Sequence, residues 1–340
     1  MLISKNKHPK KNIYLGIQIL RMIFSFNIVV DHCLNIIYQN KIIYFFCIMG
    51  IKYYVPTFFF ISFYFSYKTF SSRNIIKLKE RLLRISVPYI IWPCIMWMKY
   101  NFVNRIKDLE DTNKYKYLLY QLIIGKPFHP VFWFQFCLLF WSILIIILLL
   151  SFKHIYNFIM LFILIIILYL NRFGLINLLF KNYKPIISRS IKELFKTILY
   201  IMSGYFFGSI EILEKSFVVK IKIIILLFIF VFLFKYPKYE YNNENIVIQF
   251  IVIIIFIASS FIIQDLIKNK FILSYIKHLT NFTGGIYYLH WDMKYRTLAN
   301  ISSIKKGTFI SCLVIYLICY FFCFFNYKIF KKTIFKYLFI

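Results

Sequence analysis

Apolar stretches of membrane-spanning length recur from one end of this 340-residue chain to the other. A helix needs about 20 mostly apolar residues to cross a bilayer core, and in lipid an unbroken apolar run must satisfy its backbone within a helix. The chain is 61% hydrophobic, against about 45–50% for typical soluble domains. We therefore predict an all-α polytopic membrane protein with about ten transmembrane helices, at 14–37, 42–67, 85–103, 131–152, 154–170, 194–212, 217–235, 245–265, 275–293 and 308–328.

We expect one membrane domain over 1–340, because no Gly/Ser-rich linker or shift in composition divides the chain. Short basic tails are expected at 1–12 and 329–340, and the first apolar run is too long for a cleavable signal peptide. The basic loop 68–84 favours the cytoplasm and the acidic loop 104–130 the outside, although the basic loop 171–193 runs against this scheme. The sequence thus predicts a multi-pass protein of the inner or plasma membrane with both termini cytoplasmic.

The net charge of +30 would suit a nucleic-acid-binding protein, but its distribution favours a different partner. The Lys and Arg residues are spread over short loops between apolar runs, so we expect contact with the lipid bilayer and none with nucleic acid. The seven cysteines form neither a CxxC pair nor a zinc-ligand spacing, and we expect no metal.

Arg21 and His32 lie eleven residues apart inside the first apolar run. Eleven residues at about 100° each make three turns plus about 20°, so both side chains share one helical stripe, about 16 Å apart along the axis. Ionisable groups inside membrane helices are costly and are usually functional. The alternative is an Arg that reaches toward the headgroups and a His that is only packed.

The same stripe carries further polar groups. Ser25 and Gln39 lie within about 40° of Arg21, and Asp31 lies at the edge of the stripe. A His beside a carboxylate can act as a general base, and an Arg can stabilise a phosphate or an oxyanion. We interpret this stripe as facing protein or a water-filled cavity.

Two arginines three residues apart, Arg81 and Arg84, precede the third predicted span at its cytoplasmic end. Positive-inside anchoring is the ordinary explanation, and binding of a phosphate-rich donor is the functional one. Trp133 lies in the aromatic cluster 132–134, which is typical of an interface belt. Tyr287 and His290 end another apolar stretch, where a cavity lining or a belt would both explain them.

Five segments, in order, resemble the bacterial acyltransferase-3 family of integral membrane acyltransferases. The family's Arg, ten residues, then His matches Arg21 and His32, and its Phe-rich segment ending in Ser-Gly matches 58–64, with Ser62 at the Ser position. The basic segment closing on Pro matches 81–88, and the Trp-Phe and Tyr-x-x-His elements match 132–134 and 287–290. The resemblance covers roughly residues 12–330.

The resemblance implies transfer of an acyl group, acetyl above all, from acyl-CoA (acetyl-CoA) to a hydroxyl of a surface glycan or glycolipid. No bound cofactor is implied. His32 would be the general base or acyl relay, Arg21 would hold the oxyanion or the donor phosphate, and Arg81 and Arg84 would bind the donor. Direct transfer and a covalent acyl-enzyme both remain open, as do the acceptor, the acyl group and the oligomeric state.

The chain departs from the family at Phe63, where relatives have Gly after the Ser. A bulky ring at that position favours a non-catalytic scaffold as one alternative. A transporter or flippase is the other, because an intramembrane Arg, His and Asp set can also mark a substrate or proton path.

Overall fold

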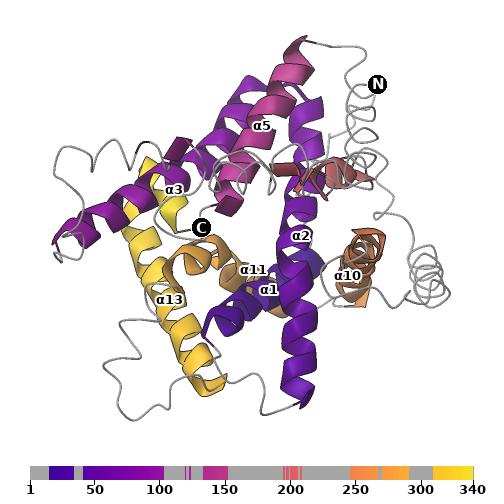
Figure 1. Cartoon of the computed structure of the whole chain (residues 1–340), viewed down its shortest axis with the longest axis vertical. Helices are drawn as coiled ribbons and strands as arrows, with labels where there is room; N and C mark the ends of the chain where they lie inside the picture. The colour runs from indigo at the N-terminus through magenta and orange to yellow at the C-terminus, as the bar shows by residue number, and fades with distance from the viewer. Residues whose placement is uncertain are drawn as a thin grey trace, which may run out of the picture. The chain divides into compact units, whose positions relative to one another are not determined.

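The computed structural model describes twelve stretches of the chain, and each of its elements there is a helix (Figure 1). The stretches are 15–33, 41–102, 119, 122–123, 133–151, 194–195, 197–198, 200–205, 207–208, 246–266, 270–290 and 309–339. The main elements are α1 (Leu15–Cys33), α2 (Lys41–Ser71), α3 (Ile75–Phe102), α5 (Trp133–Ser151), α10 (Ile246–Leu266), α11 (Lys270–Thr280), α13 (Phe309–Phe330) and the 3-10 helix η5 (Ile334–Leu338). The all-α class is thus confirmed.

Two of the described helices are long and apolar enough to cross a membrane. These are Trp133–Ser151 and Ile310–Phe330, and the shorter stretches Gly16–Val30 and Ile251–Ser260 are also apolar. The predicted number of ten spans is not confirmed. The predicted spans 154–170 and 217–235 and the tail 1–12 lie outside the described residues.

The chain groups into two compact units, so the single-domain expectation stays a prediction. The first unit comprises Met1–Ile23 and Leu213–Thr280, and the second Phe24–Ile212 and Asn281–Ile340. Within the first unit, a Cβ added at Gly16 would meet the backbone carbonyl of Ser260. The start of α1 therefore approaches the α10 backbone closely, as small residues allow between helices.

The segment predicted as loop 68–84 is mostly helical. α2 continues to Ser71, and α3 begins at Ile75, ten residues before the apolar run. Arg73 turns the chain with a φ of 50°, and the Asn74 side chain accepts a hydrogen bond from the Lys77 backbone N–H at 3.1 Å. Asn is a favoured N-cap, so this cap and the good helix formers that follow explain the earlier start. Pro88, which closes the segment 81–88, lies inside α3.

The predicted span 275–293 is not one helix. α11 ends at Thr280, residues 281–282 form a turn, and a new helix runs through 283–290. The sequence Asn281-Phe282-Thr283-Gly284-Gly285 is poor in helix formers, which explains the break. Gly285 also allows close packing, because a Cβ there would lie 2.5 Å from Cys323 Sγ and 2.9 Å from the Phe339 carbonyl.

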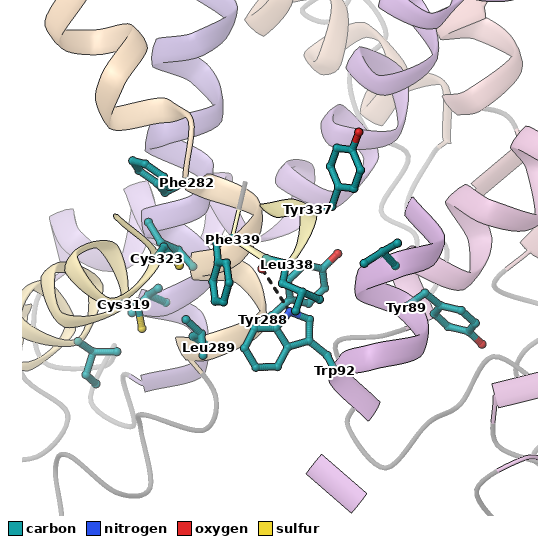
Figure 2. Packing of buried hydrophobic residues seen from close by; sticks show 14 of the residues in the cluster. Tyr89, Trp92, Phe282, Tyr288, Leu289, Cys319, Cys323, Tyr337, Leu338 and Phe339 are labelled. Carbon is teal, nitrogen blue, oxygen red and sulfur yellow. Dashed lines mark hydrogen bonds between the residues drawn. The ribbon is translucent and has the colours of Figure 1, made fainter. Parts of the chain in front are cut away.

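The core of the second unit joins α3, helix 283–290, α13 and η5. Figure 2 shows most of its members. Trp92 stacks on Tyr288 with ring centroids 6.2 Å apart and donates from Nε1 to the Leu338 carbonyl at 3.3 Å. The predicted basic tail 329–340 is therefore part of the packed structure, because Tyr337, Leu338 and Phe339 are buried.

The helix described in part over 194–208 packs closely on α2. A Cβ at Gly204 would meet the Phe60 carbonyl, and one at Gly208 would lie 2.5 Å from the Tyr64 carbonyl. Two glycines four residues apart form a GxxxG pattern that lets two helix backbones approach. The glycines contact one face of α2. A different face of α2, which carries Ser62 and Phe63, contacts α3 and α5.

Candidate functional site

Arg81 places a guanidinium among α2, α3 and α5, which are in mutual contact (Figure 1). Its Nη2 donates to Ser62 Oγ at 3.3 Å and to Ser142 Oγ at 3.4 Å. The guanidinium carbon lies 5.1 Å from the Phe63 ring centroid and 5.2 Å from that of Phe70. Two hydroxyls and two aromatic rings therefore surround this cation.

No carboxylate balances Arg81 among the residues that the structure describes. The ion pair found there joins its neighbour Arg84 to Glu80, with Nη2 and Oε1 2.5 Å apart. The Arg81 Nε is buried and has no hydrogen-bond acceptor within the described parts of the chain. A cation that is removed from water without a counter-charge is costly, so a retained one suggests an anion that binds there.

The Arg81 guanidinium keeps its charge at neutral pH. Burial, and then repulsion from Arg84, lowers the pKa of Arg81 to about 9. Exposed basic residues at the start of α3, Lys77 and Lys79, add positive potential nearby. The arrangement can therefore attract a phosphate or carboxylate and bind it by charge-assisted hydrogen bonds.

Arg84, predicted to act with Arg81, has different surroundings. Its side chain is 58% exposed and pairs with Glu80 one helical turn back. An exposed, paired arginine is available at the surface but is already partly neutralised. The structure thus separates the two arginines into a half-buried unbalanced cation and an exposed ion pair.

Ser62, which the sequence placed in the site by resemblance, does lie beside Arg81. Its neighbour Phe63, the departure from the family pattern, is fully buried with its ring toward the guanidinium. The close backbone approach on α2 occurs instead at Phe60 and Tyr64, where the other helix supplies the glycines. The bulk of Phe63 therefore does not obstruct a helix crossing.

Ser142 was not among the site residues predicted from the sequence. It is fully buried and lies at the middle of α5. The available signal was that Ser142 is the one hydroxyl residue in the apolar stretch 134–150. A lone polar group in such a stretch seeks a partner when it is buried.

An aromatic cluster lies one helical turn along α2 from Ser62 and Phe63. The Phe134 ring lies 4.5 Å from Phe59 and 5.6 Å from Tyr287 between centroids. Trp133 lies 6.1 Å from Phe59 by the same measure. Two predicted site residues, Trp133 and Tyr287, are thus brought to one cluster through Phe134.

His290 is fully buried rather than at an interface. Its Nδ1 lies 3.2 Å from the carbonyl oxygen of Ile286, which fixes that nitrogen as the N–H donor. The Tyr287 ring lies 6.1 Å away between centroids, so both members of the Tyr-x-x-His element are close together.

α1 includes both Arg21 and His32, so the predicted helical conformation of this stretch is confirmed. Arg21 is half-buried in the first unit, while the side chains of Asp31 and His32 lie outside the described residues. In the second unit, Ser25 is buried and its hydroxyl lies 3.1 Å from that of Tyr316. This member of the stripe therefore contacts protein, and a shared cavity-facing orientation of Arg21 and His32 stays a prediction.

Within the described ranges, no three His, Cys, Asp or Glu residues gather in a way that could hold a metal ion. The cysteines of α13, Cys312, Cys319 and Cys323, are buried free thiols on one helical face. They pack against the helix 283–290, which includes Gly285. These three cysteines therefore serve to pack α13 against that helix.

No protein-family model, curated protein or solved structure matches this chain. The described part of the chain therefore defines a class, which is a helical protein that has there two helices of spanning length and apolar character and an internal cation with no carboxylate partner.

Proposed function

We propose that this chain is an integral membrane acyltransferase that moves an acyl group from acyl-CoA to a hydroxyl of a surface glycan or related acceptor. The observation that carries the proposal is the Arg81 guanidinium, which has two serine hydroxyls within hydrogen-bond distance and no carboxylate partner among the described residues. The five segments that resemble the acyltransferase-3 family supply the reaction class.

Arg81 suits the donor because coenzyme A carries several phosphate groups. A guanidinium offers a fork of donors that matches phosphate oxygens, and Ser62 and Ser142 can turn their own O–H groups toward an anion. Lys77 and Lys79 are exposed at the start of the same helix and would raise the local donor concentration. Arg84, already paired, would contribute less.

The chemistry itself is proposed for α1. His32 would take the proton of the acceptor hydroxyl, whose oxygen attacks the thioester carbonyl. The C–S bond breaks, an ester C–O bond forms, and the proton passes to the coenzyme A thiolate. Arg21 would stabilise the developing oxyanion. A two-step route through an acyl-enzyme would use the same groups.

A membrane enzyme is needed because donor and acceptor lie on opposite sides. We propose a multi-pass protein of the cell membrane with both termini in the cytoplasm. In that orientation Arg81 lies toward the cytoplasmic side, where the donor would arrive. Among the described residues, two helices of spanning length and composition support the membrane location.

Binding of coenzyme A to purified protein in lipid nanodiscs tests the donor site. We expect Arg81→Gln to weaken binding roughly 10- to 100-fold, as loss of a hydrogen bond to a charged group does. The matched control Arg84→Gln removes an equal charge from an exposed pair and should stay within about threefold. Equal affinity of wild type and Arg81→Gln would refute this donor site.

The reaction is tested in cells. Mass spectrometry of surface glycans from cells with and without the gene should show a mass gain of one acyl unit. Proteins with His32→Ala or Arg21→Ala, shown to be folded and in the membrane, should lose it. Vesicle uptake of a glycan that needs no acyl-CoA would instead favour a transporter.

A further inference from the structure

We propose that residues 331–336, which form the turn after α13 and the start of η5 and are called the turn below, bind the headgroups of anionic phospholipids. The turn directly follows α13, whose stretch Ile310–Phe330 is one of the two candidate spans. A segment at that position lies at the membrane surface if α13 crosses the bilayer. The inference rests on the membrane location given above and is independent of the acyl transfer.

The turn is fixed by hydrogen bonds that centre on Thr333. Its backbone N–H and its hydroxyl both donate to the Phe330 carbonyl at 2.9 Å. The same hydroxyl oxygen accepts from the Phe335 N–H at 3.2 Å, and the Thr333 carbonyl accepts from the Lys336 N–H at 3.3 Å. The side chains of the turn are therefore presented from a defined backbone.

The turn presents cations and apolar side chains together. Lys331 and Lys332 are exposed, and neither takes part in an ion pair among the described residues. Ile334 and Phe335 beside them are 46% and 42% exposed. A soluble anion would bind only the ammonium groups. A lipid surface can bind both kinds of side chain, because the ring inserts at the boundary of the acyl chains while the ammonium groups contact the phosphates.

Charge across the C-terminal part of the chain favours an anionic partner. No Asp or Glu follows Asp292, while eight basic residues do, at Lys294, Arg296, Lys305, Lys306, Lys328, Lys331, Lys332 and Lys336. Lys328 Nζ lies 4.2 Å from the Phe324 ring centroid and Lys336 Nζ 4.9 Å from that of Tyr337. Of the four described cations in this part of the chain, Lys331 and Lys332 are thus the two that we assign to the lipid phosphate.

The residues that follow the turn are anchored to α3. Leu338 accepts the Trp92 Nε1–H, and Phe339 lies edge-on to Trp92 with centroids 6.3 Å apart (Figure 2). Phe339 also stacks on Phe330 at 5.9 Å between centroids, which ties the segment to the end of α13. Lipid bound at the turn would therefore stabilise the contact between α13 and the helix that carries Arg81.

Native mass spectrometry of the delipidated full-length protein tests the proposal, with phosphatidylglycerol and phosphatidylcholine of equal chain length as probes. Wild type should bind phosphatidylglycerol more tightly, and Lys331→Gln with Lys332→Gln should weaken that binding about tenfold, since each basic residue near a membrane surface adds attraction. The control pair Lys77→Gln with Lys79→Gln removes the same charge elsewhere and should change it less than about threefold.

Two further arms identify the ligand. Phe335→Ser should weaken binding of both lipids and keep the preference for the anionic one, whereas inorganic phosphate should not compete. Equal binding of the two lipids by wild type, no effect of the turn variants, or competition by inorganic phosphate would each overturn the proposal. Coenzyme A binding measured on the same samples reports separately on the proposed function.

Discussion

Arg81 Nη2 lies 3.4 Å from the Ser142 hydroxyl, although the two residues are 61 positions apart in the chain. This contact brings the start of α3 to the middle of α5, which is one of the two candidate spans. A neutral hydroxyl accepts a hydrogen bond from a cation but does not balance its charge. The relationship therefore makes Arg81 a site that gains by meeting an anion.

Replacing Arg81 by Met should separate stability from binding. An unbalanced, half-buried cation costs free energy, so the free energy of unfolding should stay within about 1 kcal/mol of wild type or increase, while coenzyme A binding falls. Thermal unfolding in detergent and ligand titration on the same sample measure both quantities. A large drop in unfolding temperature would show that Arg81 serves the fold instead.

Replacing Trp92 by Phe should cost about 1 kcal/mol of unfolding free energy, because the indole N–H bonded to the Leu338 carbonyl is lost while an aromatic ring remains against Tyr288. Trp141→Phe is the matched control, since the buried Trp141 Nε1 has no hydrogen-bond partner. That change removes a similar volume but no hydrogen bond, so it should cost less than Trp92→Phe. Equal losses in the two variants, read from chemical denaturation, would contradict the assigned bond.

Adding one methyl group at Gly204 should loosen the helix crossing, because the new Cβ would meet the Phe60 backbone carbonyl. We expect Gly204→Ala to destabilise the protein by about 1–3 kcal/mol, as overpacking does. Ser203→Ala, next in the chain and also buried, adds no volume and should change stability by less than about 1 kcal/mol. Thermal unfolding of the pair distinguishes crowding from a general sensitivity of this helix.

A double-mutant cycle on Ser25→Ala and Tyr316→Phe should give a coupling energy of about 0.5–1.5 kcal/mol, since their hydroxyls lie 3.1 Å apart. Denaturant unfolding of the four proteins provides the values. Additive losses would mean that the two hydroxyls do not interact, and that the α1 stripe does not face α13 at Ser25.

The sequence by itself determined where most described helices lie. Predicted spans 14–37, 131–152, 245–265 and 308–328 agree closely with α1, α5, α10 and α13. The physical reason is local, because a long apolar run can satisfy its backbone only within a helix when no water is present. The sequence also singled out Ser62 and Arg81 separately, by resemblance and by spacing.

Only the tertiary structure decided which of these side chains meet. It brought Ser142 and Arg81 together, turned Arg84 outward to Glu80, and placed Leu338 on Trp92 across 246 positions of the chain. It also packed Gly285 against α13, so closely that a Cβ there would lie 2.5 Å from Cys323 Sγ. Rotation of each helix about its axis is set by packing against distant segments, so periodicity along one run cannot specify it.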